Sequence, residues 1–370
     1  MDRYLSLQIA EDLKHKMVFL GGPRQVGKTT LARSLLPTKK TGYLNWDIPR
    51  DRESILRRAL PDTPLLVFDE LHKYRKWRGY IKGVFDELHP KKKILVTGSA
   101  RLDLYRYGGD SLQGRYHYLK LHPLSFAEIG GKSQNDLEAL LTLGGFPEPF
   151  LAGSLARARR WAVEYRSRLI QEDIAAVENV RDLGTMELLS ISLPERVGSP
   201  LSINALREDL QINHQTVGRW LDIFERLYSI FRLMPLGAPK IRAVKKERKH
   251  YHFNWAIVPD EAARYENMIA CHLLKWVDYI FATEGREIEL RYFRDVDSRE
   301  VDFVLVEKRQ PILLIECKLA NGAPAPSLRY LKERFPQARA VQVIRDDVPS
   351  TIHRGDLEVC SARKFLGELV

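Results

Sequence analysis

The first residues suited to chemistry form a glycine-rich loop near the N-terminus. Residues 22–29 read Gly-Pro-Arg-Gln-Val-Gly-Lys-Thr and match the pattern GxxxxGK(S/T) at every fixed position. Backbone N–H groups of such a loop surround phosphate oxygens, Lys28 reaches the β- and γ-phosphates, and the Thr29 hydroxyl ligates Mg²⁺. We therefore predict a nucleotide site with Mg²⁺, built from Gly22, Pro23, Arg24, Gln25, Val26, Gly27, Lys28, Thr29 and Thr30.

Two carboxylates follow the apolar run 65–68 and complete this predicted site. Asp69 suits a role in the magnesium shell, and Glu70 suits orientation or deprotonation of the attacking water. The next apolar run, 94–97, leads into Ser99, a small polar residue placed where it could sense the γ-phosphate. Strand ends also carry Ser and Thr for turn formation, so this last assignment has a purely structural alternative.

A second acidic group lies near the C-terminus. Asp302 and the sequence Glu316-Cys-Lys318 stand in two apolar runs that a short turn near Lys308 would join. Carboxylates at adjacent strands can bind Mg²⁺, and Lys318 can position or activate a water that attacks a phosphodiester. An acid followed by Lys at the end of a strand is common in α/β proteins, so a structural role is the alternative.

A third group is polar and basic. Residues 202–210, a break at 211–213, and residues 214–227 predict two helices joined by a turn. The apolar spacing of the second helix leaves His214, Gln215 and Arg219 outside, where a recognition helix meets a DNA groove. A strand at 228–234 and a basic run follow, the layout of a winged helix, and we predict phosphate contacts from Lys245, Lys246, Arg248 and Lys249. A solvated charged face and a protein-binding winged helix are the alternatives.

The elements that position these groups divide the chain into three predicted domains. Residues 17–100 alternate short apolar runs with helical stretches, which predicts an α/β fold with a buried parallel sheet. The turn formers at 144–149 end this region. We therefore predict a P-loop NTPase domain over 1–150, a helical linker with a winged helix over 151–258, and a third α/β domain over 259–370.

Composition limits the classes of function. The chain has 370 residues, and 59 Lys and Arg against 48 Asp and Glu give a net charge of +11, which favours a polyanionic partner. No apolar run approaches the roughly 20 residues of a membrane span, and the N-terminal residues do not form an apolar signal segment. The three cysteines are widely spaced and contain no CxxC. We expect a cytoplasmic protein with no membrane, disulfide framework or zinc site.

Several motifs together resemble a family of bacterial and archaeal AAA-type ATPases that carry a C-terminal region of unknown function. They are the loop 22–31, the strand ending in Asp69 and Glu70, and the segments 97–100, 112–115, 122–128 and 144–147. The resemblance implies that the nucleotide is ATP and that the protein forms a homo-oligomer, such as a ring. It also implies that Arg115 is an arginine finger for a neighbouring subunit, with an ion pair to an acid such as Asp110 as the alternative.

The last domain resembles the PD-(D/E)xK restriction-endonuclease-like fold. In that resemblance, Glu266 on the preceding helix completes a metal shell with Asp302 and Glu316, beside Lys318. Val301 replaces the Pro of the motif. Near relatives often have Asp where this chain has Asn254, a position to which the sequence assigns no role.

Three functions remain open at this point. The leading one is a Mg²⁺-dependent ATPase that binds and remodels DNA, such as a translocase, a helicase or a motor on branched DNA. The second is an ATP-gated, metal-dependent nuclease. The third is a regulatory switch in which the nucleotide state changes the binding of protein partners.

Overall fold

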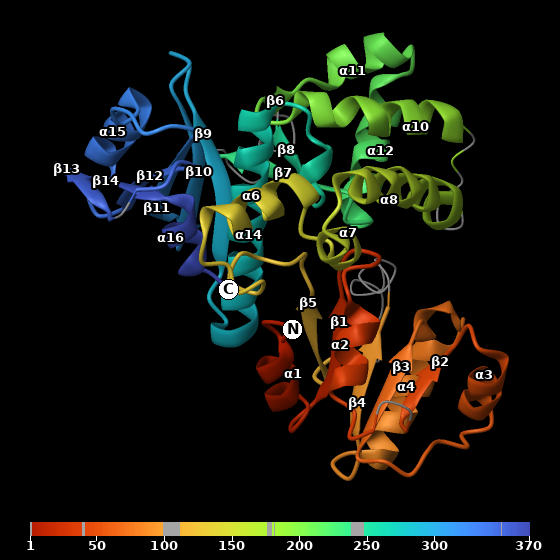
Figure 1. The fold of residues 1–370 in the computed structure, drawn as a ribbon. Helices are drawn as coiled ribbons and strands as arrows, with labels where there is room; N and C mark the ends of the chain where they lie inside the picture. Colours follow the sequence, from red (N-terminus) through yellow and green to blue (C-terminus); the bar gives the residue numbers. More distant parts are fainter. Residues whose placement is uncertain are drawn as a thin grey trace. The chain divides into compact units, whose positions relative to one another are not determined.

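The computed structural model describes residues 2–38, 41–98, 112–175, 180, 182–237, 248–348 and 350–370. The chain divides into two compact units (Figure 1). The first contains residues 1–123 together with 226–228, and the second contains residues 124–225 and 229–370. Each unit has its own β-sheet, with five strands in the first and nine in the second.

The sheet of the first unit is parallel throughout, as predicted from its continuously apolar runs. Its strands are arranged in the order β2-β3-β4-β1-β5. The pairing sets Asp69 beside Asn45 and Thr97, so three polar residues meet at the carboxyl ends of neighbouring strands. The strands are β1 (Met17–Gly21), β2 (Tyr43–Asn45), β3 (Leu65–Asp69), β4 (Lys93–Thr97) and β5 (Tyr116–Lys120).

The helices of the first unit lie before β1 and between successive strands. They are α1 (Ser6–Asp12), α2 (Lys28–Ser34), α3 (Pro49–Leu56), the 3₁₀ turn η1 (Leu71–Lys73) and α4 (Trp77–Leu88). Every residue of β1 and β3 is buried. Phe19, Phe68 and Trp77 contribute the large side chains of a core between the sheet and α4. This buried apolar core fixes the strand ends that carry the polar residues.

The second unit begins with helices. They are α6 (Gln134–Leu143), α7 (Pro147–Ala152), α8 (Leu155–Arg168), the π-helical η3 (Leu169–Ile174), α10 (Leu183–Ser192) and the 3₁₀ turn η4 (Leu193–Arg196). Ser133 begins α6 with a capping box, because its hydroxyl accepts from the Asp136 amide while the Asp136 carboxylate accepts from the Ser133 amide. The predicted helical linker therefore includes α8, which continues into the π-helical η3.

A helix-turn-helix follows, flanked by short strands. β6 (Pro200–Leu201) precedes α11 (Ile203–Leu210) and α12 (His214–Arg226), and β7 (Ile230–Pro235) and β8 (Arg248–His252) come after them. β8 pairs antiparallel with both β6 and β7. Gln211 adopts a left-handed conformation with φ of 53°, which produces the predicted break between the two helices.

The remaining elements form the larger part of the nine-stranded sheet. They are η5 (Trp255–Ile257), α14 (Glu261–Glu284), β9 (Ile288–Arg294), β10 (Glu300–Glu307), β11 (Gln310–Lys318), α15 (Pro326–Arg334), β12 (Arg339–Ile344), β13 (Ile352–Arg354), β14 (Leu357–Ser361) and α16 (Ala362–Gly367). β9, β10 and β11 form an antiparallel meander, and β11, β12 and β14 are parallel. Lys308 and Arg309 have positive φ and form the predicted turn between β10 and β11.

One sheet continues across the boundary predicted at residue 258. β7 pairs in parallel with β9, with Met234 opposite Arg291 and Pro235 opposite Tyr292. The strand order is therefore β13-β14-β12-β11-β10-β9-β7-β8-β6. The helix-turn-helix strands and the strands that carry Asp302 and Glu316 share a single hydrogen-bonded sheet.

Candidate nucleotide site and a second carboxylate site

The phosphate loop connects β1 to α2 and depends on its two glycines. Gly22 has φ of 127°, and a Cβ atom there would lie 2.3 Å from the carbonyl oxygen of Leu121. Gly27, at the N-terminus of α2, has φ of 100°. Side chains other than hydrogen are therefore excluded at both positions by contact or by backbone conformation.

Lys28 lies inside this loop. Its side chain is buried, and Nζ donates to the carbonyl oxygens of Gly22 at 3.0 Å and Pro23 at 2.6 Å. The loop therefore holds a positive charge against its own backbone, at the N-terminus of a helix where an anion is stabilised. Thr30 is exposed, whereas Arg24 and Gln25 are half-buried.

Arg3, in the N-terminal segment, also contacts the phosphate loop. The sequence analysis did not identify Arg3 as a site residue. Its guanidinium donates to the carbonyl oxygens of Val26 at 2.8 Å and His122 at 2.5 Å. One side chain thus joins the phosphate loop to the segment that follows β5. A lone Arg near an N-terminus carries no sequence signal for such a contact.

Asp69 accepts hydrogen bonds from three hydroxyl groups. Thr29 Oγ1 and the Tyr43 hydroxyl donate to Oδ2 at 2.9 and 2.5 Å, and Thr97 Oγ1 donates to Oδ1 at 2.6 Å. The structure therefore brings together Thr29 and Asp69, the two residues predicted to hold Mg²⁺. Neutral donors orient this carboxylate and leave its negative charge in place.

Glu70 lies next to Asp69 in a left-handed conformation with φ of 57°. Its Oε2 lies 3.3 Å from the Nζ of Lys73. Burial raises the pKa of Glu70, and the neighbouring Lys73 ammonium opposes that increase. A raised pKa makes a carboxylate a better proton acceptor, as the predicted role of Glu70 requires. Ser99 lies outside the described residues.

Arg115 pairs with an acid other than the one considered from the sequence. Its Nε and Nη2 donate to the two carboxylate oxygens of Asp86 at 2.7 and 3.3 Å. Asp86 belongs to α4 and is remote from Arg115 in sequence, whereas Asp110 lies outside the described residues. This bidentate pair fixes the guanidinium plane.

The C-terminal acidic residues occupy neighbouring positions on β10 and β11. The backbone N–H of Cys317 donates to Asp302 Oδ2 at 2.8 Å, and Lys318 Nζ donates to Glu316 Oε1 at 2.7 Å. Glu266 comes from α14 and accepts from the Tyr251 hydroxyl at 2.6 Å. Glu266, Asp302 and Lys318 line a cleft of about 540 Å³.

Lys249 is the residue whose place differs most from prediction. We expected it to contact DNA phosphates, but its side chain is 0% exposed. Its Nζ lies 3.1 Å from Glu266 Oε1, 2.5 Å from Glu300 Oε1 and 3.7 Å from Asp302 Oδ1. The prediction was wrong for a physical reason: three carboxylates compensate this charge inside the protein, so it is unavailable to a phosphate.

The predicted metal shell of Glu266, Asp302 and Glu316 is also not assembled. Among the described residues, no three His, Cys, Asp or Glu side chains are grouped so that they could hold a metal ion. Lys249 lies between Glu266 and Asp302, and Lys318 pairs with Glu316. An ammonium group therefore lies beside each of the three carboxylates, although Glu316 Oε2 is buried and has no hydrogen-bond partner in the described part of the chain.

Burial also shifts the protonation of these acids. It raises the pKa of Glu266 and of Glu316 to about 7, in each case reinforced by the Asp302 charge and opposed by a lysine. Burial likewise raises the pKa of Asp302, against the charge of Lys249. The cluster therefore holds carboxyl groups that titrate close to neutral pH.

Apart from the buried Lys249, the predicted DNA-contacting residues fall into three classes. His214, Gln215 and Arg219 are exposed on α12, as the apolar spacing of that helix predicted. Arg248 is half-buried at the start of β8. Lys245 and Lys246 lie outside the described residues. The exposed surface of α12 is thus the described part of the predicted DNA interface.

Asn254 packs against the glycine turn that follows α6. A Cβ atom at Gly144 would lie 2.8 Å from Asn254 Oδ1, and the next residue, Trp255, donates from its indole to the Leu140 carbonyl at 2.9 Å. The segment that contains Asn254 therefore contributes to packing between α6 and α14, away from the carboxylates.

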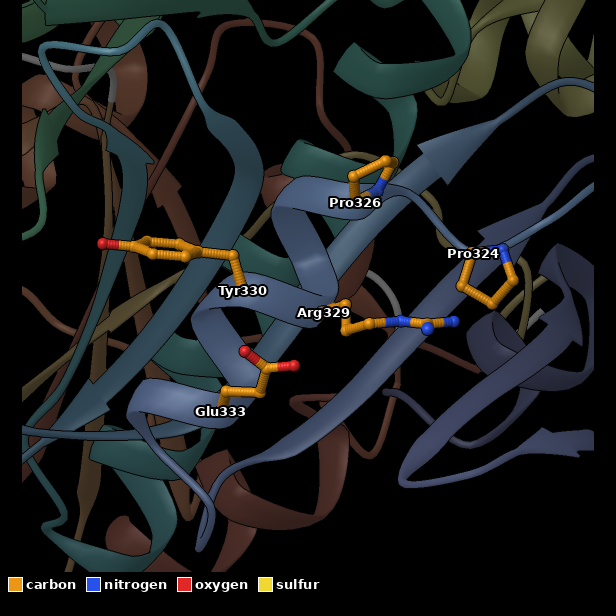
Figure 2. Close-up of a pocket in the computed structure, with 5 residues that line it drawn as sticks. All are labelled: Pro324, Pro326, Arg329, Tyr330 and Glu333. Atoms are coloured by element: carbon orange, nitrogen blue, oxygen red, sulfur yellow. The ribbon is translucent and has the colours of Figure 1, made fainter.

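A smaller hollow of about 340 Å³ lies on α15 and contains none of the predicted site residues. Its lining is Pro324, Pro326, Arg329, Tyr330 and Glu333, and Figure 2 shows Arg329 extending toward Pro324. Tyr330 is already stacked beneath the guanidinium of Arg299, 4.3 Å from the ring centroid.

Three families match consecutive parts of the chain. Residues 14–130 match an AAA domain, and residues 134–260 and 262–363 match two domains of unknown function. Together with the parallel sheet and the phosphate loop, the first match supports an AAA-type, nucleotide-binding ATPase domain at the N-terminus. Within the described residues, no helix has the length and apolar character needed to cross a membrane.

Curated relatives are distant. Uncharacterized proteins of Mycobacterium tuberculosis and Mycobacterium bovis are each 25% identical over 238 residues, covering 64% of this chain and 53% of theirs. The chain thus spans about half the length of these relatives. An uncharacterized protein of Methanocaldococcus jannaschii is 21% identical and covers 94% of this chain and 83% of its own length.

A solved structure with a related arrangement is the ORC1 protein of Aeropyrum pernix in complex with DNA. It is 13% identical, covers 73% of this chain and 93% of its own, and superposes with a TM-score of 0.34.

Proposed function

We propose that this protein is a Mg²⁺-dependent ATPase that binds and remodels DNA. The observation that carries the ATPase half is the 2.9 Å hydrogen bond between Thr29 Oγ1 and Asp69 Oδ2. It joins the phosphate-loop hydroxyl to a strand-end carboxylate, the pair of oxygen ligands that holds Mg²⁺ in P-loop ATPases. Lys28 and the loop N–H groups would bind the phosphates, and Glu70 would orient or deprotonate water.

The residues present fit Mg²⁺ and a nucleotide phosphate. Asp69 accepts hydrogen bonds from three neutral hydroxyl groups, which orient the carboxylate without adding a compensating positive charge. Lys28 and the N-terminus of α2 supply positive potential where an anion would lie. Bound Mg²⁺ would neutralise phosphate charge, and the protein's part is to position the groups and exclude competing contacts.

The DNA half rests on charge and on the helix-turn-helix. The chain carries a net charge of +11, and α12 exposes His214, Gln215 and Arg219 after the turn at Gln211. The strands β6, β7 and β8 beside these helices support a winged helix. The protein would bind DNA through this surface, and ATP hydrolysis in the ATPase domain would supply the energy for remodelling.

Purified full-length protein tests both halves of the proposal. We expect Lys28→Ala to reduce ATP turnover by at least about 100-fold, because it removes the charge that contacts the phosphates. Lys14→Ala is the matched control, since Lys14 is exposed and pairs only with Glu11 across one helical turn. Wild-type affinity for forked DNA should fall steeply as salt rises.

Each half has its own negative outcome. Unchanged turnover in Lys28→Ala would refute the ATPase assignment. Turnover that needs Lys28 without any salt-sensitive affinity for DNA would refute the DNA half and favour a nucleotide-dependent regulatory switch. If the protein separates or rearranges forked strands of unchanged length, remodelling is supported.

Arg115 would act in a neighbouring subunit of a homo-oligomer, held by Asp86. A mixing experiment tests this role, because Lys28→Ala keeps Arg115 and Arg115→Ala keeps the phosphate loop. Each variant alone should be inactive, while their mixture should regain ATP turnover if the two groups meet across a subunit interface. No recovery between variants that assemble would assign Arg115 to its pair with Asp86 alone.

The alternative of an ATP-gated nuclease is favoured by one observation, the cleft lined by Asp302, Glu266 and Lys318. It requires Mg²⁺-dependent strand scission that Asp302→Asn removes while ATP turnover survives. Denaturing gels of end-labelled DNA distinguish it from remodelling, since only cleavage shortens strands.

A further inference from the structure

Lys249 is the centre of the C-terminal carboxylate cluster. It extends from β8 and is fully buried, and its Nζ lies within 4 Å of the carboxylates of Glu266, Glu300 and Asp302. A buried ammonium is tolerated only when opposite charges and hydrogen bonds replace its water. Three carboxylates from two separate elements, α14 and β10, meet that requirement here.

The remaining positions around Lys249 are also filled. The ring centroid of Tyr292 lies 5.7 Å from Nζ, and the Tyr251 hydroxyl shares Glu266 Oε1 with the ammonium. Asp302 Oδ2 accepts from the Cys317 backbone. Glu266 Oε1 and Asp302 Oδ2 therefore already have donors from this chain, whereas Glu316 Oε2 is buried without a hydrogen-bond partner among the described residues.

These residues do not fit the metal ion that a PD-(D/E)xK-like fold implies. Mg²⁺ binds carboxylate oxygens at about 2.0–2.1 Å and adds two positive charges to its site. The Lys249 ammonium stands between Glu266 and Asp302, where such an ion would bridge them, and a cation beside it would be repelled. Among the described residues, no three His, Cys, Asp or Glu side chains, these included, are grouped so that they could hold a metal ion.

We infer that the Lys249 ammonium takes the place of the metal ion in this nuclease-like site. The C-terminal region is then a metal-independent module whose carboxylates stabilise a lysine, and it does not cut a phosphodiester. The inference concerns residues outside the ATPase domain, so it holds or fails independently of ATP hydrolysis.

Lys249 connects the carboxylate cluster to the helix-turn-helix, because it belongs to β8. β8 pairs with β6 and β7, which flank α11 and α12, so Lys249 reaches the carboxylates from the strand that follows the predicted wing. A cation supplied in this way is fixed in stoichiometry and cannot be removed by a chelator. The site is complete only when both segments of the sheet are folded together.

Binding of Mn²⁺, a paramagnetic substitute for Mg²⁺, tests the inference on nucleotide-free, full-length protein. Electron paramagnetic resonance counts bound Mn²⁺ in the wild type, Asp302→Asn, Lys249→Met and the double variant. Background binding near Asp69 is common to all four proteins, so differences between them report the cluster.

We expect the wild type and Asp302→Asn to bind equal amounts of Mn²⁺. Lys249→Met should bind about one more ion per chain, because it keeps the length of the side chain but frees the carboxylates. The double variant should lose that ion. A wild-type ion that Asp302→Asn removes would overturn the inference, as would a folded Lys249→Met that gains none.

Two further measurements keep the test decisive. If circular dichroism shows that Lys249→Met does not fold, the wild type compared with Asp302→Asn and Glu266→Gln still decides whether a metal ion is present. End-labelled DNA incubated with the wild type and Mn²⁺ should keep its length. Scission that Asp302→Asn abolishes would show a metal-dependent nuclease and contradict the inference.

Discussion

Asp69 and Asp302 each stand in a β-strand with little exposure to water, but chemically different neighbours hold them. Three hydroxyl groups donate to Asp69 and orient its carboxylate without adding a compensating positive charge. Asp302 shares the Lys249 ammonium with Glu266 and Glu300, so its charge is compensated within the protein. Asp69 and Asp302 look alike in sequence, since each is an acid in a β-strand. They differ in the structure because the Lys249 ammonium compensates the charge of Asp302, whereas hydroxyl groups donate to Asp69.

The difference shows what decides whether a carboxylate can serve a metal ion. Hydroxyl donors are neutral, so they fill the lone pairs of a carboxylate without cancelling its charge. The carboxylate can therefore still attract a divalent cation. An ammonium satisfies the same lone pairs and cancels the attraction. The identity of the donors therefore distinguishes the two sites more clearly than the number of acids does.

Exchanging each aspartate for its amide should give the largest contrast. We expect Asp69→Asn to reduce ATP turnover by about 10³-fold, because the amide loses the charge that would hold Mg²⁺. Asp302→Asn should change turnover by less than about twofold, since it leaves the first unit intact. Steady-state phosphate release measures both. Equal losses would mean that the C-terminal cluster takes part in ATP hydrolysis.

Removal of Lys249 should give the next largest effect. Lys249→Ala leaves three carboxylates buried without their counter-ion, which should lower the free energy of unfolding by about 3 kcal/mol. Lys14→Ala, which breaks an exposed pair, should cost less than about 0.5 kcal/mol. Urea unfolding followed by circular dichroism compares them. Similar midpoints for the two variants would contradict the role given to Lys249.

The pH dependence of stability should reveal Glu316. Burial raises its pKa from an ordinary 4.5 to about 7, so the folded protein holds an extra proton between these values. Stability contributed by that proton is lost as pH rises from about 5 to 7, by about 1 kcal/mol per pH unit. Glu316→Gln should lack the part of this loss that comes from Glu316 and keep the part that comes from Glu266, whose pKa is also raised to about 7. Parallel stability curves for the two proteins would show that Glu316 has an ordinary pKa.

The smallest effect should be on DNA affinity. Lys318 is 48% exposed beside the cleft, so Lys318→Ala should weaken binding about threefold and reduce the salt slope by about one. Lys364→Ala on α16 removes the same charge elsewhere and should leave affinity unchanged. Fluorescence anisotropy at several salt concentrations measures both slopes. Equal effects of the two variants would exclude specific contact at the cleft.

The nucleotide site was largely predictable because its parts carry local signals. The glycines and Lys28 stand in consecutive positions, and Asp69 ends a strand whose apolar run is continuous. The helix-turn-helix was also predictable, since helical spacing of apolar residues determines which side of α12 is exposed. The structure adds Tyr43 and Arg3, whose partners are distant in sequence.

The second carboxylate site was predictable only in part. The turn at Lys308 and the pairing of β10 with β11 follow from local patterns. The burial of Lys249 does not, because Lys249 stands in a run of basic residues that resembles a solvated surface. Its partners come from α14 and β10, and only the folded sheet brings them together. The pairing of β7 with β9 could not be predicted either, because only the folded sheet brings these two strands together.

The parallel pairing of β7 with β9 limits where this chain can be divided, either by truncation or by recombination between genes. The two sequence families meet near residue 261, yet a fragment that begins there would expose the backbone edge of β9 and leave Glu266 and Asp302 without Lys249. Such a fragment should aggregate or unfold. Recombination between genes would have to move residues 200–370 as one piece. The family boundary near residue 261 therefore does not separate two segments that can be exchanged independently.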